Sequence, residues 1–234
     1  MKYLQTSLHV GDNDCASDAL RPEQLAAIHV RELQQKIDEL APDAPPDSRL
    51  RLTLEYCYAL LEGHLFREAW ESARQALDTA VSEGLWTQGV EACDIMFQSE
   101  QEQSIKALAH GIWLGVTFPV DPELSVAMLQ HLIDESPDRS DGAAVSAAVA
   151  CYLVDLRATG NQRDELVFFT QQMLGQVARR HSQVEDQEIF EFWMQQLELD
   201  NPDKFLPRLA KVLNLLTEGD WWFDRDRLRA QIPE

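Results

Sequence analysis

Histidine and carboxylate side chains are the groups of this chain that could carry out acid–base or metal chemistry. None of the histidines follows a glutamate at the Glu-x-x-His spacing with which helical bundles bind carboxylate-bridged metals. Glycine-rich phosphate loops, GxSxG, HExxH and the calcium-loop pattern are also absent from the sequence. We therefore predict no catalytic residue, no metal site and no cofactor. The six histidines are His9, His29, His64, His110, His131 and His181.

His110 and His131 are the two histidines that could still contribute to a site. Both fall in expected helices, 104–116 and 122–136, beside apolar positions. A histidine in such a place is expected to be buried and hydrogen-bonded, which makes it part of the core. The alternative is a helical enzyme whose pocket combines these two histidines with nearby acids. That hypothesis requires the two side chains to meet.

An acidic stretch at 185–203 contains seven carboxylates and no base, with aromatic residues between them. The first interpretation is an amphipathic helix over 185–199 whose acidic face is solvated. The functional alternative is a docking strip for a basic partner, because aromatic anchors are typical of interaction surfaces. The candidate partner-binding residues of this strip are Glu188, Phe190, Glu191 and Trp193.

Two tryptophans near the end of the chain form a second candidate surface. Trp221 and Trp222 lie between Asp220 and Asp224, and the arginine-rich segment 225–231 follows them. One interpretation is that the indoles clamp the last helix onto the body of the protein, with the arginines paired to acidic groups. The other is that Trp221 or Trp222 is an exposed partner-binding anchor.

The charge balance restricts the class of partner. The 234 residues include 40 acidic and 20 basic side chains, which gives a formal net charge of −20. Such a field repels nucleic-acid phosphates and anionic membranes, so we expect neither as a direct partner. It favours another protein with a basic surface, although an acidic surface also keeps a soluble protein dispersed. A further alternative is an acidic mimic that blocks a basic nucleic-acid-binding surface.

Cysteine usage and hydropathy indicate the compartment. The four cysteines contain no CxxC pair, and three of them lie in helical patterns where a free thiol behaves as a small apolar residue. The first residues lack the apolar core of a secretory signal, and no stretch is long and apolar enough to span a bilayer. We therefore expect a cytoplasmic protein.

Apolar residues recur with the helical period along almost the whole chain, and almost nothing alternates with period two. We expect a polar lead-in at 1–20, with a short extended piece at 3–10, a single helical domain at 21–219 and a docking segment at 220–234. Asp141 is expected to cap a nearly apolar, buried helix that Gly160 ends. The expected helices cover about 22–40, 48–62, 64–83, 86–97, 104–116, 122–136, 142–159, 163–181, 185–199, 202–216 and 225–231.

A tight helical hairpin over 47–84 is the clearest unit. Asp47 can cap its first helix, Gly63 can end that helix, and Gly84 can end the second. Alanines recur in the second helix at spacings of four, three and four, which places a stripe of small residues against a neighbouring backbone. These alanines are Ala69, Ala73, Ala76 and Ala80.

With Gly63 at the turn and alanines in the second helix, residues 49–80 resemble a single tetratricopeptide unit. The helix-ending proline of that family is missing. The resemblance implies a helical-hairpin stack that binds a peptide or protein in a concave groove.

The separations between the expected turns are not constant, so the fold we predict is all-α. It is either an irregular helical-hairpin repeat, a tetratricopeptide-like solenoid, or a compact helical bundle of about ten helices. The predicted function is a non-catalytic protein-interaction module, an adaptor or assembly chaperone. Its partner is expected to be another protein, bound through a helical groove or an acidic aromatic surface. Homodimerisation is left open.

Overall fold

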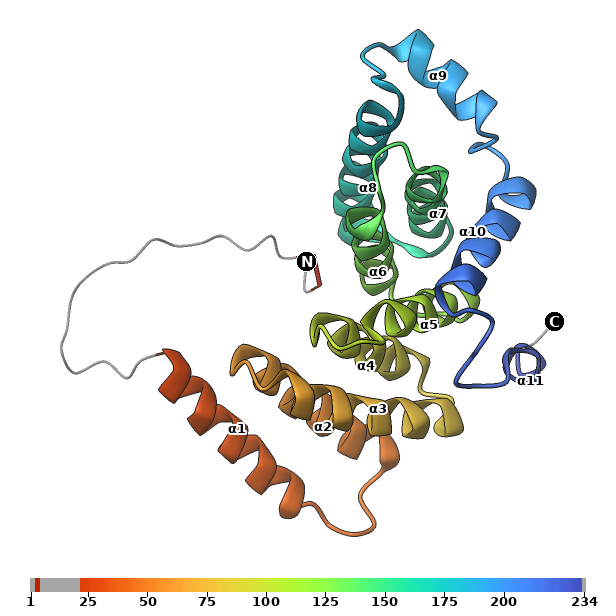
Figure 1. Cartoon of the computed structure of the whole chain (residues 1–234). Helices are drawn as coiled ribbons and strands as arrows, with labels where there is room; N and C mark the ends of the chain where they lie inside the picture. Colours follow the sequence, from red (N-terminus) through yellow and green to blue (C-terminus); the bar gives the residue numbers. More distant parts are fainter. Residues whose placement is uncertain (1–2, 5–21, 233–234) are drawn as a thin grey trace, which may run out of the picture.

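The computed structural model describes residues 3–4 and 22–232, and in this part of the chain it contains eleven helices and no strand (Figure 1). The all-α prediction of about ten helices is confirmed, and the short helix expected at 225–231 is the five-residue α11. Apart from Tyr3 and Leu4, the predicted lead-in and extended piece lie outside the described residues. The helices are α1 (Pro22–Asp38), α2 (Pro46–Glu62), α3 (Phe66–Glu83), α4 (Trp86–Gln98), α5 (Ser104–Thr117), α6 (Pro122–Glu135), α7 (Asp141–Arg157), α8 (Gly160–Ser182), α9 (Gln187–Gln196), α10 (Pro202–Leu216) and α11 (Arg225–Arg229).

Asp121 caps α6, whereas the cap expected at Asp47 is wrong. The Asp121 carboxylate accepts the backbone N–H of Glu123 at 2.8 Å. Helix α2 instead begins after Pro45, whose side chain makes no capping hydrogen bond, because Pro46 already supplies the fixed φ that the first helical position needs. Asp47 lies inside the first turn, where its carboxylate accepts from Gln88 Nε2 at 2.6 Å.

The ends of α7 also differ from expectation. Ser140 caps the helix, and Asp141 is the first helical residue, so its carboxylate is directed to other helices. At the other end α7 stops at Arg157, before the expected Gly160. Gly160 has φ +58° and begins α8 instead, because a glycine in the left-handed region can precede one helix as readily as it follows another.

The alanine stripe of the hairpin is buried, as the spacing predicts. All four alanines of α3 are at most 3 % exposed, and α3 packs between α2 and α4. Gly84 ends α3 in the left-handed conformation. A Cβ on Gly89 of α4 would lie 3.6 Å from the Ala80 Cβ, so these two helices approach closely at small residues.

Helices from α1 to α9 each pack against the next one in sequence, and four of them also contact one another in a row. Helix α4 contacts α2 and α6, and α6 contacts α8, so α2, α4, α6 and α8 lie in one row. On the other side, α10 packs across α5 and α7 (Figure 1). This order makes α4, α6 and α8 present side chains along one face.

Helix α7 is the centre of the C-terminal half, as its apolar sequence predicts. Residues 143–150 are all buried, and α7 contacts α6, α8 and α10 around it (Figure 1). One continuous core of buried side chains extends from Leu50 of α2 to Leu228 of α11. Among the described residues, no helix is both long enough and apolar enough to cross a membrane.

Three arginines bind the backbone carbonyls at the C-terminal ends of other helices. Arg157 of α7 donates to the carbonyls of Gly115 and Val116 at 2.6 and 2.7 Å, at the end of α5. Arg180 of α8 donates to Ile133 of α6 at 2.9 Å, and Arg208 of α10 donates to the carbonyl of Leu197 after α9. Each guanidinium thereby gives a further donor to carbonyls in the last turn of a helix, where partners within the helix are few. The Ile133 carbonyl also accepts from the backbone N–H of Ser136.

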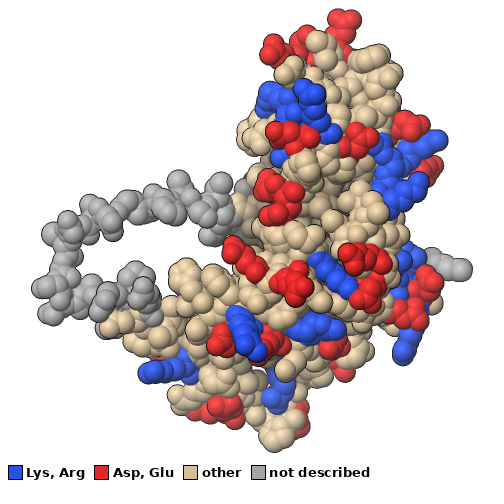
Figure 2. Space-filling model, viewed as in Figure 1, with Lys and Arg blue, Asp and Glu red and all other residues tan. Residues whose placement is uncertain are grey.

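Charged side chains of both signs are interspersed on the face shown in Figure 2. Several basic side chains are paired locally, as Arg51 is with Asp47 and Arg67 with Glu71 across one helical turn. On this face the net charge of −20 therefore does not collect into a continuous acidic surface.

Substituting Gly111 with alanine tests the close approach of α5 to its neighbours. A Cβ there would lie 2.4 Å from Met128 Cε and 2.7 Å from Cys93 Cβ, closer than van der Waals contact. We expect Gly111→Ala to lower the free energy of unfolding by about 1–3 kcal/mol in urea denaturation. The matched control is Gly175→Ala in α8, where the nearest atoms are those of the flexible Arg179 side chain at 3.9 Å. That variant should gain up to about 1 kcal/mol from helix propensity. Equal effects would contradict the assigned packing.

Candidate functional site

Within the acidic strip predicted at 185–203, the structure contains α9 (Gln187–Gln196), which is shorter than the helix expected over 185–199 and is followed by a turn and the start of α10. Its aromatic residues divide between buried and exposed positions. Trp193 is 5 % exposed and its ring lies 5.8 Å from that of the half-buried Phe190. Glu188 and Glu191 are exposed, and the most exposed aromatic of the helix is Phe192, at 60 %. Trp193 therefore anchors α9 to the protein itself. Partner binding by this strip stays a prediction.

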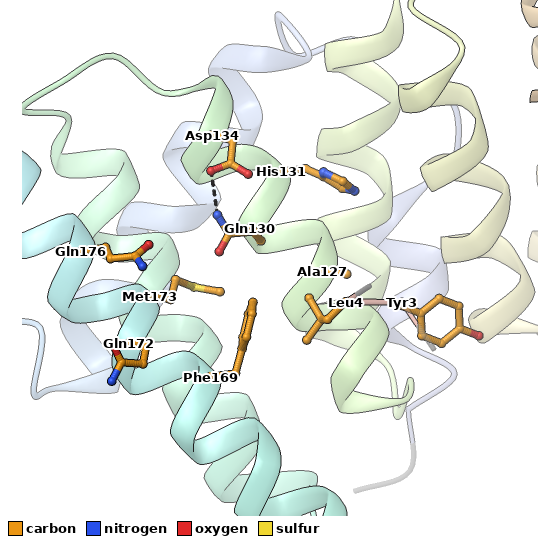
Figure 3. Close-up of a pocket in the computed structure, with 10 residues that line it drawn as sticks. All are labelled: Tyr3, Leu4, Ala127, Gln130, His131, Asp134, Phe169, Gln172, Met173 and Gln176. Carbon is orange, nitrogen blue, oxygen red and sulfur yellow. Dashed lines mark hydrogen bonds between the residues drawn. The ribbon is translucent and has the colours of Figure 1, made fainter. Parts of the chain in front are cut away.

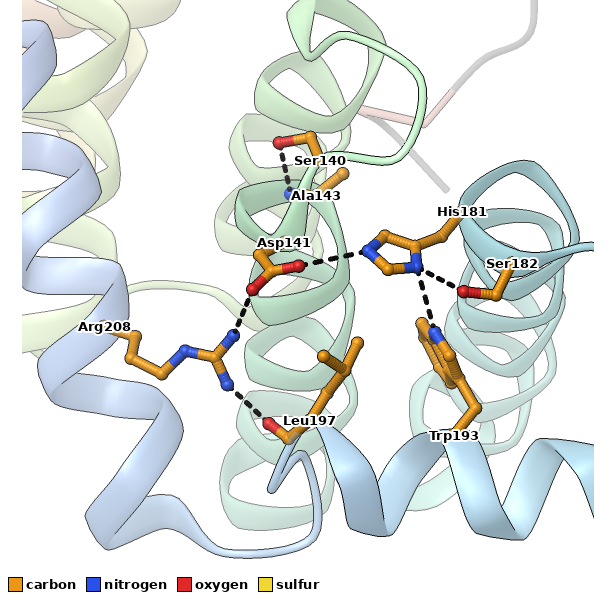
Figure 4. Close-up of polar contacts among 8 residues, drawn as sticks. All are labelled: Ser140, Asp141, Ala143, His181, Ser182, Trp193, Leu197 and Arg208. Atoms are coloured by element: carbon orange, nitrogen blue, oxygen red, sulfur yellow. Dashed lines mark hydrogen bonds and ion pairs between the residues drawn. The ribbon is translucent and has the colours of Figure 1, made fainter.

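A hydrogen-bonded chain centred on His181 attaches α9 to three other helices (Figure 4). Trp193 Nε1 donates to His181 Nδ1 at 3.2 Å, so the other ring nitrogen, Nε2, carries the proton and faces Asp141 at 3.1 Å. The second Asp141 oxygen pairs with Arg208 at 3.3 Å. Ser182 Oγ also lies 2.7 Å from His181 Nδ1. Ser182, His181 and Asp141 have the residue types of a hydrolase catalytic triad. However, His181 Nδ1, the nitrogen that faces Ser182, also accepts a hydrogen bond from the buried Trp193 indole.

The Trp221–Trp222 segment folds back over α5, in agreement with the clamp interpretation. The Trp222 ring stacks on that of His110 with centroids 4.2 Å apart, and its backbone N–H donates to His110 Nε2 at 2.9 Å. Lys106 forms an ion pair with Asp220 at the start of the segment. Both tryptophans are half-buried.

The arginines after the tryptophans contact aromatic rings as well as acids. The Arg225 guanidinium lies 4.0 Å from the Trp221 ring centroid and also donates to Asn214. Arg229 lies 5.4 Å from the Trp113 ring and pairs with Asp226 at 3.3 Å, within its own helix. The expected pairing of these arginines with acids of the body is thus replaced by cation–π contacts for Arg225 and Arg229.

The structure places His110 and His131 in separate surroundings. His110 is fully buried, and its contacts are with Lys106 and the 221–223 segment. His131 Nε2 lies 3.2 Å from Asp94 Oδ1, and its ring packs on Phe97. The two histidines of the enzyme hypothesis thus share no hydrogen-bonding or ring partner among the described residues. In this part of the chain, no group of three or more His, Cys, Asp and Glu side chains is arranged to hold a metal ion.

The N-terminal residues Tyr3 and Leu4 lie against the face formed by α4, α6 and α8. Both of their backbone N–H groups point to one oxygen of Glu123, at 2.7 and 3.3 Å. The Tyr3 hydroxyl donates to Glu91 of α4 at 2.6 Å. Glu123 is only 7 % exposed. A short piece of polypeptide is thereby held by side chains about a hundred residues away in sequence.

A cavity of about 470 Å³ lies beside Tyr3 and Leu4, between α6 and α8 (Figure 3). A second cavity of about 560 Å³ shares His131 and Asp134 with it and extends toward the α4–α5 turn. We call the two together the groove. Its α6 and α8 walls consist of Ala127, Gln130, His131, Asp134, Phe169, Gln172, Met173 and Gln176, and its far end of Phe97, Gln98, Glu100, Gln101, Ser104, Ile105 and Glu135.

Sequence reasoning missed the groove and named only His131 among its residues. The available signal was weak: Tyr3 and Leu4 are apolar residues in a polar lead-in, and Glu123 is an acid at the start of an apolar helix. The predicted partner-binding residues of α9 and of the Trp221–Trp222 segment do not line the groove.

Burial of His110 makes the stability of the clamp dependent on pH. Desolvation lowers the pKa of His110 from 6.5 to about 4, so the folded protein keeps the ring neutral while the unfolded chain binds a proton below about pH 6.5. Stability is therefore lost as the pH falls from about 6.5 through 4. We expect this group alone to account for about 3 kcal/mol of that loss.

The measurement is urea unfolding of the unmodified chain and of His110→Asn, followed by tryptophan fluorescence at pH 7.5 and pH 4. Other titrating groups affect both proteins equally, so the difference between the two unfolding free energies isolates His110. We expect this difference to be large at pH 7.5 and to shrink at pH 4. A difference that does not change with pH would contradict a buried neutral histidine.

Comparison with known proteins adds no relative. None of the protein-family models, curated proteins or solved structures compared with the chain matches it. The resemblance of residues 49–80 to a tetratricopeptide unit gains no support from these comparisons.

Proposed function

We propose that this chain is a non-catalytic protein-interaction module, an adaptor or assembly chaperone, that binds an extended segment of another protein in the groove. The observation that carries the proposal is the composition of the groove along α6 and α8. Phe169 and Met173 supply an apolar floor, and the rim contains the amides Gln130, Gln172 and Gln176. Primary amides present both a donor and an acceptor, as a peptide group does, so they suit an extended backbone.

The charge of the groove indicates the chemistry of the partner segment. Asp134 is common to both cavities, and Glu100 and Glu135 line the far end with no lysine or arginine among the residues that line it. Opposite charge favours association and orients the partner as it approaches. The partner segment is therefore one with apolar side chains for the floor and basic side chains for the carboxylate end.

A second surface competes with the groove. On α9, Phe192 is 60 % and Ile189 47 % exposed, one helical turn apart. Exposed apolar residues of this size, flanked by the acids Glu188 and Glu191, suit a basic amphipathic partner. This second proposal retains the acidic strip of 185–203 as a docking surface.

Affinity purification with two matched double variants distinguishes these surfaces. Gln172→Arg/Gln176→Arg places two charges of the wrong sign on the groove rim, at exposed positions outside the core. Gln187→Arg/Gln195→Arg makes the same change on exposed positions of α9. We expect the partner recovered with the unmodified chain to bind the groove variant about ten-fold more weakly and the α9 variant unchanged. The reverse result would assign the partner to α9. If both variants bind the partner as well as the unmodified chain does, neither surface is the binding site.

A further inference from the structure

Tyr3 and Leu4 occupy the edge of the groove in the way that a bound peptide would. Two successive backbone N–H groups converge on a single oxygen of Glu123, and the phenol reaches Glu91 on the adjacent helix. These contacts join positions 120 and 88 residues apart, so no local turn imposes them. The backbone contacts use no feature special to this segment, since any non-proline residue offers the same N–H group.

Glu123 requires donors of this kind. It lies in the first turn of α6, where the helix N-terminus stabilises a negative charge. A carboxylate as buried as this one pays a large desolvation cost unless hydrogen bonds compensate it. Among the described residues, its donors are the N–H groups of Tyr3 and Leu4. A replacing segment would have to offer the same pair of N–H groups.

The docked pair leaves most of the groove unfilled. Leu4 forms one wall of the 470 Å³ cavity and points toward it, with Phe169 and Met173 opposite (Figure 3). A volume of that size is enough for several further side chains of a longer ligand. Tyr3 and Leu4 therefore make the anchoring contacts without using the rest of the site.

We propose that Tyr3–Leu4 is an intramolecular occupant of the partner site, which a partner segment displaces. The same contacts define that segment: an extended peptide with an aromatic hydroxyl residue followed by an aliphatic one, whose two N–H groups bind Glu123. This inference rests on the function proposed for the groove. Because Tyr3–Leu4 belongs to the same chain as the site, its effective concentration there is on the order of millimolar. A partner segment must compete with that concentration.

The experiment measures binding of a fluorescently labelled peptide of residues 1–8, MKYLQTSL, to the full-length chain by anisotropy. We expect Tyr3→Ala/Leu4→Ala, which vacates the site, to bind the peptide at least about ten-fold more tightly than the unmodified chain, which still holds its own segment. Circular dichroism and tryptophan fluorescence check that the variant remains folded. Equal affinities, or binding to neither protein, would overturn the proposal.

Two further arms test the chemistry in the Tyr3→Ala/Leu4→Ala background. Adding Glu123→Gln should weaken the peptide about five-fold, because a neutral acceptor replaces a charged one. The matched control is Asp155→Asn, an exposed carboxylate of α7 that pairs with Arg163 and should leave the affinity unchanged. A peptide phosphorylated on its tyrosine should bind at least about ten-fold more weakly, since it adds about two negative charges beside Glu91. A phosphopeptide that binds as well as the unmodified one would contradict the assigned tyrosine contact.

The outcomes separate this inference from the function on which it rests. If the peptide fails to bind while partner recovery still depends on Gln172 and Gln176, the groove is an interaction site and the intramolecular occupant is wrong. If the peptide binds the vacated chain through Glu123 while partner recovery ignores the groove, the occupant is correct and the proposed function is wrong.

Discussion

Close approach of helix backbones at small side chains is the constraint on which the rest of this structure depends. The alanines of α3 are buried, Ala80 lies against Gly89 of α4, and Gly111 of α5 lies against Cys93 of α4. Where a larger side chain would hold helices apart, these residues allow α4 to contact α2, α3, α5 and α6 at once. This packing brings α2, α4, α6 and α8 into one row, and the groove lies on the outer side of that row along α4, α6 and α8.

The same row of helices contains the carboxylates that the fold buries. Asp94 of α4 accepts from Tyr58 of α2 and from Gln98, and His131 of α6 lies beside its other oxygen. Glu123 accepts from the N-terminal segment. Glu123 is thus satisfied by groups from another part of the chain, whereas Asp94 Oδ1 is buried without a hydrogen-bond partner among the described residues. The hydrogen bond from Tyr58 to the other Asp94 oxygen joins α2 to α4. The buried carboxylates and the groove therefore lie on the same side of the molecule.

Helical periodicity alone was enough to predict the fold class and the approximate extent of almost every helix. The ends were less predictable where two adjacent residues could both act as a cap. Ser140 caps α7 rather than Asp141, and Pro46 removes the need for a cap at Asp47. Gly160 is compatible with either neighbouring helix, and only the surrounding packing decides which one it joins.

The groove could not be read from local patterns, because it depends on three helices meeting one distant segment. Tyr3 contacts Glu123 of α6 and Glu91 of α4 at once, which requires these two helices to lie side by side. The predicted surfaces were local instead: the α9 strip and the tryptophan pair were visible as clusters in sequence. Trp193 and Trp222 both contact other elements of the protein, which composition alone could not distinguish from contact with a partner.

The arginine caps have a consequence for how the molecule comes apart. In a linear stack of helices, each element responds mainly to its immediate neighbours, and the end of the stack can fray without disturbing the middle. Here the Arg157 guanidinium of α7 donates to a carbonyl at the end of α5, and the Arg180 guanidinium of α8 donates to a carbonyl at the end of α6. Unwinding a later helix therefore uncovers carbonyls in an earlier one. Arg157 and Arg180 thus connect helices that are two apart in the sequence, and we expect the helices from α5 to α8 to unfold together.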